Sequence, residues 1–266
     1  MTVRRGFLFA IPVLGALLLI LTLIFTTSPQ PSYKGRTLKQ WTREYGKPED
    51  HSQANQAIWA IRSNALPLLV NMMAEPDWSV ALKRKVFLFR KKFHIAQNDP
   101  GPSAHPQEDA AQAIGALGPA AQPAVPGLIK TYERGPAKEA LVLGTLARIG
   151  PGSSNALPII IRGSLSKNRD TRINASAALA SLKLEPRIQV PLFIQALRDD
   201  YDCVIMNTLS GLARFGTNAK PAVPVILPLL KQTNVHDYAS QVLSVIDPEA
   251  AIAAGVWVPW AARGFK

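Results

Sequence analysis

Residues 114–132 read IGALGPAAQPAVPGLIKTY, and this stretch decides the fold. An apolar run ends at Gly118, and a second apolar run follows Pro126. Glycine at the end of a helix adopts a positive φ without a steric penalty, and proline suits the first turn of a helix, where its missing N–H costs no hydrogen bond. The stretch therefore predicts one helix that ends at Gly118 and a second that begins at Pro126, with Pro123 keeping the loop between them extended.

The same pattern recurs along the chain. An aliphatic residue precedes proline at Leu66-Pro67, Val125-Pro126, Leu157-Pro158, Val190-Pro191 and Val223-Pro224. The last four of these prolines are 32, 33 and 33 residues apart. An apolar pair at spacing three precedes each proline and recurs once more, as Ile58/Ile61, Ile114/Leu117, Leu146/Ile149, Leu179/Leu182, Leu212/Phe215 and Leu243/Ile246. Because one helical hairpin cannot bury its apolar face alone, this period predicts an all-α chain, an α-α superhelix or solenoid of about five to six stacked hairpins over residues 53–254.

Two copies depart from the pattern, and extra chain separates the first two copies. Lys183 stands where three other copies have glycine, so this copy lacks the glycine turn. Pro228 lies inside a predicted second helix, where we expect it to kink or restart the helix. Residues 74–106 are predicted to be an insertion between the first and second copies.

The C-terminal end of the repeat region is predicted to be capped. Asp247-Pro248 begins a last short helix that Gly255 ends. The aromatic tail, residues 255–266, then carries Trp257 and Trp260. Terminal repeats need caps, so these tryptophans are expected to pack over the last hairpin.

The N-terminal segment predicts a membrane anchor. Residues 6–26 (GFLFAIPVLGALLLILTLIFT) carry no charge and follow Arg4 and Arg5. A helix of this length reaches about 30 Å, enough to cross the hydrocarbon core, and no small-residue cleavage pattern follows it. We therefore expect residues 1–28 to be an uncleaved single-pass signal anchor. Basic residues flank both ends, so the positive-inside rule is ambiguous, and the short leader favours placing the solenoid on the extracytoplasmic (periplasmic) side.

Residues 29–52 are predicted to be a linker and a short capping helix. In the stretch TLKQWTREYG (37–46), Thr37 and Gln40 have capping-box spacing, and Gly46 is expected to stop the helix. Trp41 is expected to cover the end of the apolar body that follows.

The charge of the chain is concentrated near its N-terminus. The net charge is +12, and residues 1–100 hold 14 Lys/Arg against 6 Asp/Glu. Within the insertion, the stretch ALKRKVFLFRKKFHI (81–95) predicts a basic amphipathic helix. Its apolar face comprises Leu82, Val86, Phe89 and Phe93. Its candidate contacts to an anionic surface are Lys83, Arg84, Lys85, Arg90, Lys91 and Lys92.

Three interpretations of this basic segment stay open at this stage. Such a helix can lie on anionic lipid, each cation near the surface adding about 1 kcal/mol. It can also grip a nucleic-acid backbone, with Phe87 available for stacking, although an outward-facing anchored chain makes nucleic acid an unlikely partner. The third interpretation is an ordinary solenoid helix with a solvated polar face.

The sequence carries no recognisable catalytic or metal-binding motif. The four histidines match no metal-ligand spacing, and a single cysteine excludes a disulfide within the chain. Cys203 lies close to Asp199, Asp200 and Asp202, whereas reactive cysteines lie in electropositive surroundings, so we expect a small buried residue rather than a nucleophile. The three aspartates are expected to cap the start of a helix and to interact with its dipole rather than to bind a cation. We therefore expect no cofactor, no metal and no enzymatic activity.

The turn copies LGPAAQPAVPGLI, IGPGSSNALPIII and FGTNAKPAVPVIL resemble HEAT repeats and, in their short period, the HEAT-like repeats related to phycobilisome lyases. Together with the anchor and YKGRTLKQW, the chain also resembles bacterial membrane-anchored HEAT-repeat proteins of unassigned function. The resemblance implies an armadillo-like scaffold that binds a protein or peptide partner on its concave face. Two alternatives stay open: a peripheral lipid-surface organiser acting through residues 81–95, and a phycobilisome-lyase-like enzyme, for which the sequence shows no reactive residue set.

Overall fold

The computed structural model describes residues 30–47, 51–94, 101 and 103–256. Apart from one two-stranded antiparallel hairpin, β1 (Ser32–Tyr33) with β2 (Arg36–Thr37), the regular structure of these residues is helical. The predicted all-α class is confirmed. The predicted anchor, residues 1–28, lies outside the described residues, and no helix within them is both long and apolar enough to cross a bilayer.

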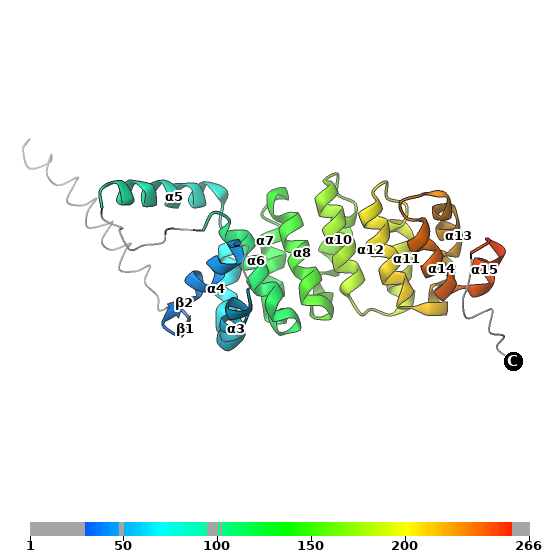
Figure 1. Ribbon diagram of the computed structural model, residues 1–266, viewed down its shortest axis with the longest axis horizontal. Coiled ribbons are helices and arrows are strands. Elements are labelled where there is room, and N and C mark those ends of the chain that lie inside the picture. Colours follow the sequence, from blue (N-terminus) through cyan, green and yellow to red (C-terminus); the bar gives the residue numbers. More distant parts are fainter. Residues whose placement is uncertain (1–29, 48–50, 95–100, 102, 257–266) are drawn as a thin grey trace, which may run out of the picture.

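The helices form hairpins that stack in sequence order into an elongated row (Figure 1). The first helices of the hairpins are α3 (Ser52–Ile61), α6 (Pro106–Leu117), α8 (Glu139–Ile149), α10 (Arg169–Ser181), α12 (Asp202–Ala213) and α14 (His236–Ile246). The second helices are α4 (Leu66–Met73), α7 (Val125–Tyr132), α9 (Leu157–Ser164), α11 (Pro186–Ala196), α13 (Val223–Ile226) and α15 (Pro248–Ala253). Each first helix contacts the next, from α3 through to α14, so one continuous core runs the length of the row.

As predicted, α6 and α8 end at Gly118 and Gly150, whereas α12 ends at Ala213, ahead of Gly216. Gly118, Gly150 and Gly216 have φ values of 52°, 72° and 51°. Each glycine begins a 3₁₀ segment, namely η3 (Gly118–Ala124), η5 (Gly150–Ala156) and η6 (Gly216–Ala222). In each of these repeats one proline then lies within the first two residues of the second helix, which confirms the placement of Pro126.

Pro123 does not keep an extended loop, and that prediction is wrong. It lies inside η3, as Pro221 lies inside η6. The φ of a 3₁₀ helix, about −50° to −70°, is the φ that the proline ring imposes, so proline favours this turn rather than an extended one.

The repeat that lacks glycine is built differently, which corrects the prediction that Pro191 opens its second helix. Pro186 begins α11, and Pro191 lies inside that helix. Leu182, before Lys183, is extended with φ −69° and ψ 155°. The buried Gln189 holds this connection, because its amide donates 2.6 Å to the Leu179 carbonyl and its oxygen accepts 3.1 Å from the Leu184 N–H.

The other predicted helix starts and stops occur where the sequence places them. The α-helix α13 ends before Pro228, and the 3₁₀ segment η7 (Leu227–Lys231) continues from it, as expected. Asp247 caps α15 by accepting 3.3 Å from the Ala250 N–H, and Gly255 has φ 78°. Trp257 and Trp260 lie outside the described residues.

The predicted apolar pairs form the core. All of them are buried except Phe215, which is half-buried and lies 6.2 Å, centroid to centroid, from the buried Phe193. The apolar residue two positions after each of the five prolines is also buried, as at Leu69 and Leu128. The sequence period therefore corresponds to one layer of core per hairpin.

A short cap covers the N-terminal end of the row. It consists of α2 (Leu38–Thr42) and the 3₁₀ segment η1 (Arg43–Gly46), and Thr37 and Gln40 form the predicted capping box. Trp41 is 5% exposed and donates 3.0 Å from Nε1 to the Tyr33 carbonyl, and the helix that carries it contacts α3 and α6. Gly46 takes no positive φ, so it is not the left-handed stop that was expected; the segment ends as the backbone becomes extended at Lys47.

Candidate functional site

The predicted basic helix stands outside the stack. It is α5 (Asp77–Lys92), which projects beside the N-terminal end of the row (Figure 1). The helix begins and ends a few residues earlier than the predicted 81–95, since His94 has φ 59° and the chain turns there. None of its residues is buried. Asp77 in its first turn and three cations in its last turn, at residues 90–92, match the helix dipole and favour the helix without a core.

All six predicted contact residues lie on α5 and are exposed. Lys83 pairs with Glu75, with 2.5 Å between Nζ and Oε1. The other five form no ion pair with any residue that the structure describes; they are Arg84, Lys85, Arg90, Lys91 and Lys92. Among the described residues, the cations of the helix therefore outnumber the acidic groups that pair with them.

The apolar residues of α5 are equally uncovered. Leu82, Val86 and Phe89 are 53%, 50% and 60% exposed, and Trp78 in the first turn is 71% exposed. These values contradict an ordinary solenoid helix, whose apolar face would lie in the core. Phe87, considered for base stacking, is half-buried with its ring packed against Gly101.

A cleft of about 690 Å³ lies beneath α5. Its apolar walls come from α4 and α5 and consist of Leu68, Met72, Val80, Leu82, Val86 and Phe87. Its charged lining adds Lys39 and Arg43 of the cap, Glu75 after α4, and Lys83 and Arg90 of α5. Sequence reasoning missed Lys39, Arg43 and Glu75 as site residues. The sequence does show that the cap is rich in cations. That these residues lie beside α5, however, depends on tertiary packing.

The charges in the cleft are unbalanced. Burial opposes ionisation of Glu75, but hydrogen bonds from Lys83 and Ser79 outweigh it, so the pKa of Glu75 lies below its usual range. Burial lowers the pKa of the Lys39 ammonium, and nearby Lys83 and Arg43 lower it further against the opposing effect of Glu75. The carboxylate of Glu75 is thus already paired with Lys83 and Ser79, and the cationic residues that line the cleft outnumber this one acid.

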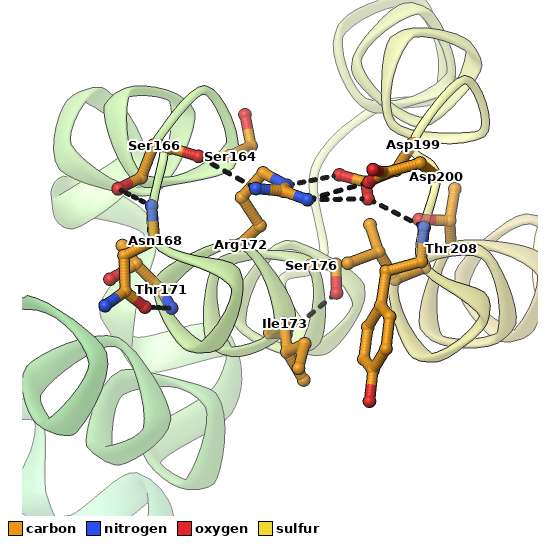
Figure 2. Close-up of polar contacts among 12 residues, drawn as sticks. Ser164, Ser166, Asn168, Thr171, Arg172, Ile173, Ser176, Asp199, Asp200 and Thr208 are labelled. Carbon is orange, nitrogen blue, oxygen red and sulfur yellow. Dashed lines mark hydrogen bonds and ion pairs between the residues drawn. The ribbon is translucent and has the colours of Figure 1, made fainter.

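Two aspartates of the acidic cluster near Cys203 pair with one arginine of the same chain (Figure 2). Arg172 donates from Nε to Asp199 at 2.7 Å and from Nη2 to Asp200 at 2.9 Å, and from Nη1 to the Ser166 carbonyl at 3.1 Å. Arg172 therefore ties the start of α10 to the turn after α11. Burial raises the pKa of Asp199, but the hydrogen bonds from Arg172 and the Tyr201 N–H outweigh it, and the pKa lies below its usual value.

The expectation that these aspartates cap α12 is therefore wrong, and the expected interaction with the helix dipole fits Asp202 alone. Tyr201 is the N-cap of α12, and its side chain makes no capping bond. Only Asp202 lies in the first turn, where it accepts 2.9 Å from Asn234. Cys203 is half-buried rather than fully buried.

No cluster of three or more potential metal ligands occurs within the described part of the chain. None of the four histidines, His51, His94, His105 and His236, therefore belongs to such a cluster among these residues. His51 Nε2 lies 3.0 Å from the Lys47 carbonyl oxygen, a local contact.

No protein-family model matches the chain, and no curated protein matches it. A crystal structure of an engineered protein is similar with a TM-score of 0.44 and 14% identity, over 82% of this chain and 97% of that chain. Nothing about function follows from this likeness.

Proposed function

We propose that this protein is a membrane-anchored HEAT-like solenoid that acts as a non-enzymatic scaffold and binds a protein or peptide on its concave face. The HEAT-like class rests on the resemblance of the turn copies, and the extracytoplasmic location rests on the apolar segment 6–26. One structural observation supports the scaffold most: first helices contact one another without a break from α3 to α14. Neighbouring repeats then present one long surface, which suits an extended partner.

Hydrogen bonds between neighbouring repeats support this proposal. Trp59 Nε1 donates 3.0 Å to the Ala116 carbonyl of the next hairpin. Asn207 Nδ2 donates 3.1 Å to Ser176 Oγ, and Arg214 Nη2 donates 3.1 Å to the Leu182 carbonyl. A surface that is already ordered loses little conformational entropy when a partner binds.

Crosslinking and pull-down of the full-length protein from its native membranes test the scaffold. The matched variant replaces the six basic residues with glutamine: Lys83, Arg84, Lys85, Arg90, Lys91 and Lys92. The same protein partner recovered with both chains would support the scaffold and make α5 incidental. Loss of every partner with the variant, or recovery of lipid alone, would move the function to α5.

A second candidate function is contact between α5 and an anionic lipid surface. It is favoured by the exposure of Trp78 and Phe89 beside uncompensated cations. The test places the full chain in nanodiscs that contain brominated lipids, with or without anionic lipid. The fluorescence of Trp78 is obtained as the difference between wild type and Trp78→Phe. Quenching of Trp78 that needs anionic lipid and weakens with salt would support lipid contact. Quenching that is equal in zwitterionic nanodiscs would contradict it.

A further inference from the structure

The cleft between α4 and α5 is not used by the proposed scaffold. We infer that this cleft binds a long-chain fatty acid, with the chain against Leu68, Met72 and Val86 and the carboxylate at Lys39 and Arg43. The inference goes beyond the proposed function, because a scaffold needs no small ligand.

The size and walls of the cleft fit one apolar chain. Its volume of about 690 Å³ lies within the range of about 300–1,000 Å³ that is typical of ligand pockets. Met72 forms a buried part of the wall, while Leu82 and Val86 on the α5 side remain at least half exposed. A chain lying between α4 and α5 would remove these side chains from water and give α5 the apolar contact that the stack does not provide.

The charges indicate an anionic head group. Four of the lining residues are cationic and one is acidic. Glu75, the acid, already accepts from Ser79 at 2.6 Å and pairs with Lys83. Lys39 and Arg43 form no ion pair with any other part of the described chain. A carboxylate placed between them would receive charge-assisted hydrogen bonds and reduce the repulsion between the two cations.

The location of the cleft gives the ligand a source, and this step rests on the proposed anchor. Lys39 follows the apolar segment 6–26 by 13 residues. A chain of that length spans at most about 45 Å when fully extended. An anchored protein would therefore hold the cleft close to a bilayer, into which fatty acids partition.

Photolabelling tests the inference. The full chain, in nanodiscs of zwitterionic lipid, is irradiated with a trace of a diazirine-bearing palmitic acid, and the adducts are mapped by mass spectrometry. We expect adducts at cleft residues of α4 and α5, with Met72 and Val86 among them. The diazirine-bearing alcohol of equal length should label them about tenfold less, since it lacks the charge-assisted bonds.

Matched variants separate the cleft from the general charge of α5. Lys39→Gln with Arg43→Gln should lower labelling about tenfold, whereas Lys91→Gln with Lys92→Gln, which removes the same charge outside the cleft, should leave it unchanged. Val86→Trp fills the cleft from its exposed side and should also abolish labelling. Equal labelling by the alcohol or by a phospholipid-borne diazirine, or adducts on residues 6–26 alone, would overturn the inference. The pull-down of a protein partner is a separate readout, so failure of the cleft and failure of the scaffold remain distinguishable.

Discussion

Arg62 and Gly118 end successive first helices in the same backbone conformation, with φ 49° and ψ −130° at Arg62 and φ 52° and ψ −132° at Gly118. Gly150 repeats this turn with φ 72° and ψ −135°. Only glycine adopts such angles without a steric penalty, because its Cβ is absent. The first repeat thus has the turn of its neighbours, with backbone strain at Arg62.

Replacing Arg62 with glycine should therefore stabilise the protein. Relief of an unfavourable φ is worth about 1–3 kcal/mol, partly offset by the greater freedom of glycine in the unfolded chain, so we expect a net gain of about 1 kcal/mol. Denaturant unfolding of the full chain in mild detergent measures the change. Gly118→Ala is the matched control and should lose about 1–3 kcal/mol. A loss of stability in Arg62→Gly would contradict the assigned strain.

Gly211 allows a close approach between α12 and the ring of Phe193 on α11. A Cβ at position 211 would overlap Phe193 Cζ, and this ring is completely buried. Alanine normally favours a helix over glycine by about 1 kcal/mol, but here overpacking should dominate and Gly211→Ala should lose about 1–3 kcal/mol.

Gly115 provides the contrasting case for the same substitution. A Cβ there would overlap Cδ of the exposed, flexible Arg148 side chain and would lie 3.2 Å from Arg148 Cβ, a contact that needs a shift of only a few tenths of an ångström. Because that side chain can move, Gly115→Ala should be neutral or stabilising by up to about 1 kcal/mol. Equal thermal midpoints for Gly211→Ala and Gly115→Ala would contradict the claim that the Phe193 ring packs too closely against Gly211 to admit a Cβ.

The Arg172–Asp199 pair should make stability depend on pH. The two side chains are 18% and 8% exposed, so the pair lies between surface and buried ion pairs and Asp199→Asn should cost about 2 kcal/mol at pH 7. The folded-state pKa of Asp199 is lowered. Its contribution is therefore present above the unfolded pKa of about 3.9 and is lost as the pH falls below it toward the folded value.

Unfolding of wild type and Asp199→Asn at pH 7 and pH 3 measures this effect. The difference in unfolding free energy should narrow at the lower pH. Asp200, whose side chain is 90% exposed, supplies the control, and Asp200→Asn should change stability by less than about 0.5 kcal/mol. A difference between wild type and Asp199→Asn that stays constant with pH would show that Asp199 does not act through its charge.

Gln189 should be the polar residue on which the glycine-free connection depends. Gln189→Leu would leave the Leu179 carbonyl and the Leu184 N–H without their side-chain partner. Each unsatisfied group costs about 1–3 kcal/mol, so we expect a loss of about 2–4 kcal/mol. The exposed Gln195 on the same helix is the control. Equal unfolding midpoints for Gln189→Leu and Gln195→Leu would rule out this role.

The parts of the fold that the sequence predicts are those where a single residue constrains its own backbone. Gly118 and Pro126 carry such constraints, and the turn between them follows directly. Pro191 misled because proline is compatible with both a helix start and a position inside this helix, and the choice depends on Gln189 and Lys183 together. The predicted site residues of α5 are local in sequence, whereas Lys39 comes near Lys83 only through the packing of the cap on α3 and α6.

The most direct test of the scaffold is site-specific photocrosslinking in native membranes. A photoreactive amino acid would replace an exposed residue on the second helices (Lys130 and Gln195), on the first helices (Arg148 and Ser210), or on α5 (Lys91). We predict that one partner protein is crosslinked from both positions of a single row, and from neither position of the opposite row. Crosslinks to that protein from Lys91 alone, or to lipid alone, would contradict a scaffold that binds along its repeats.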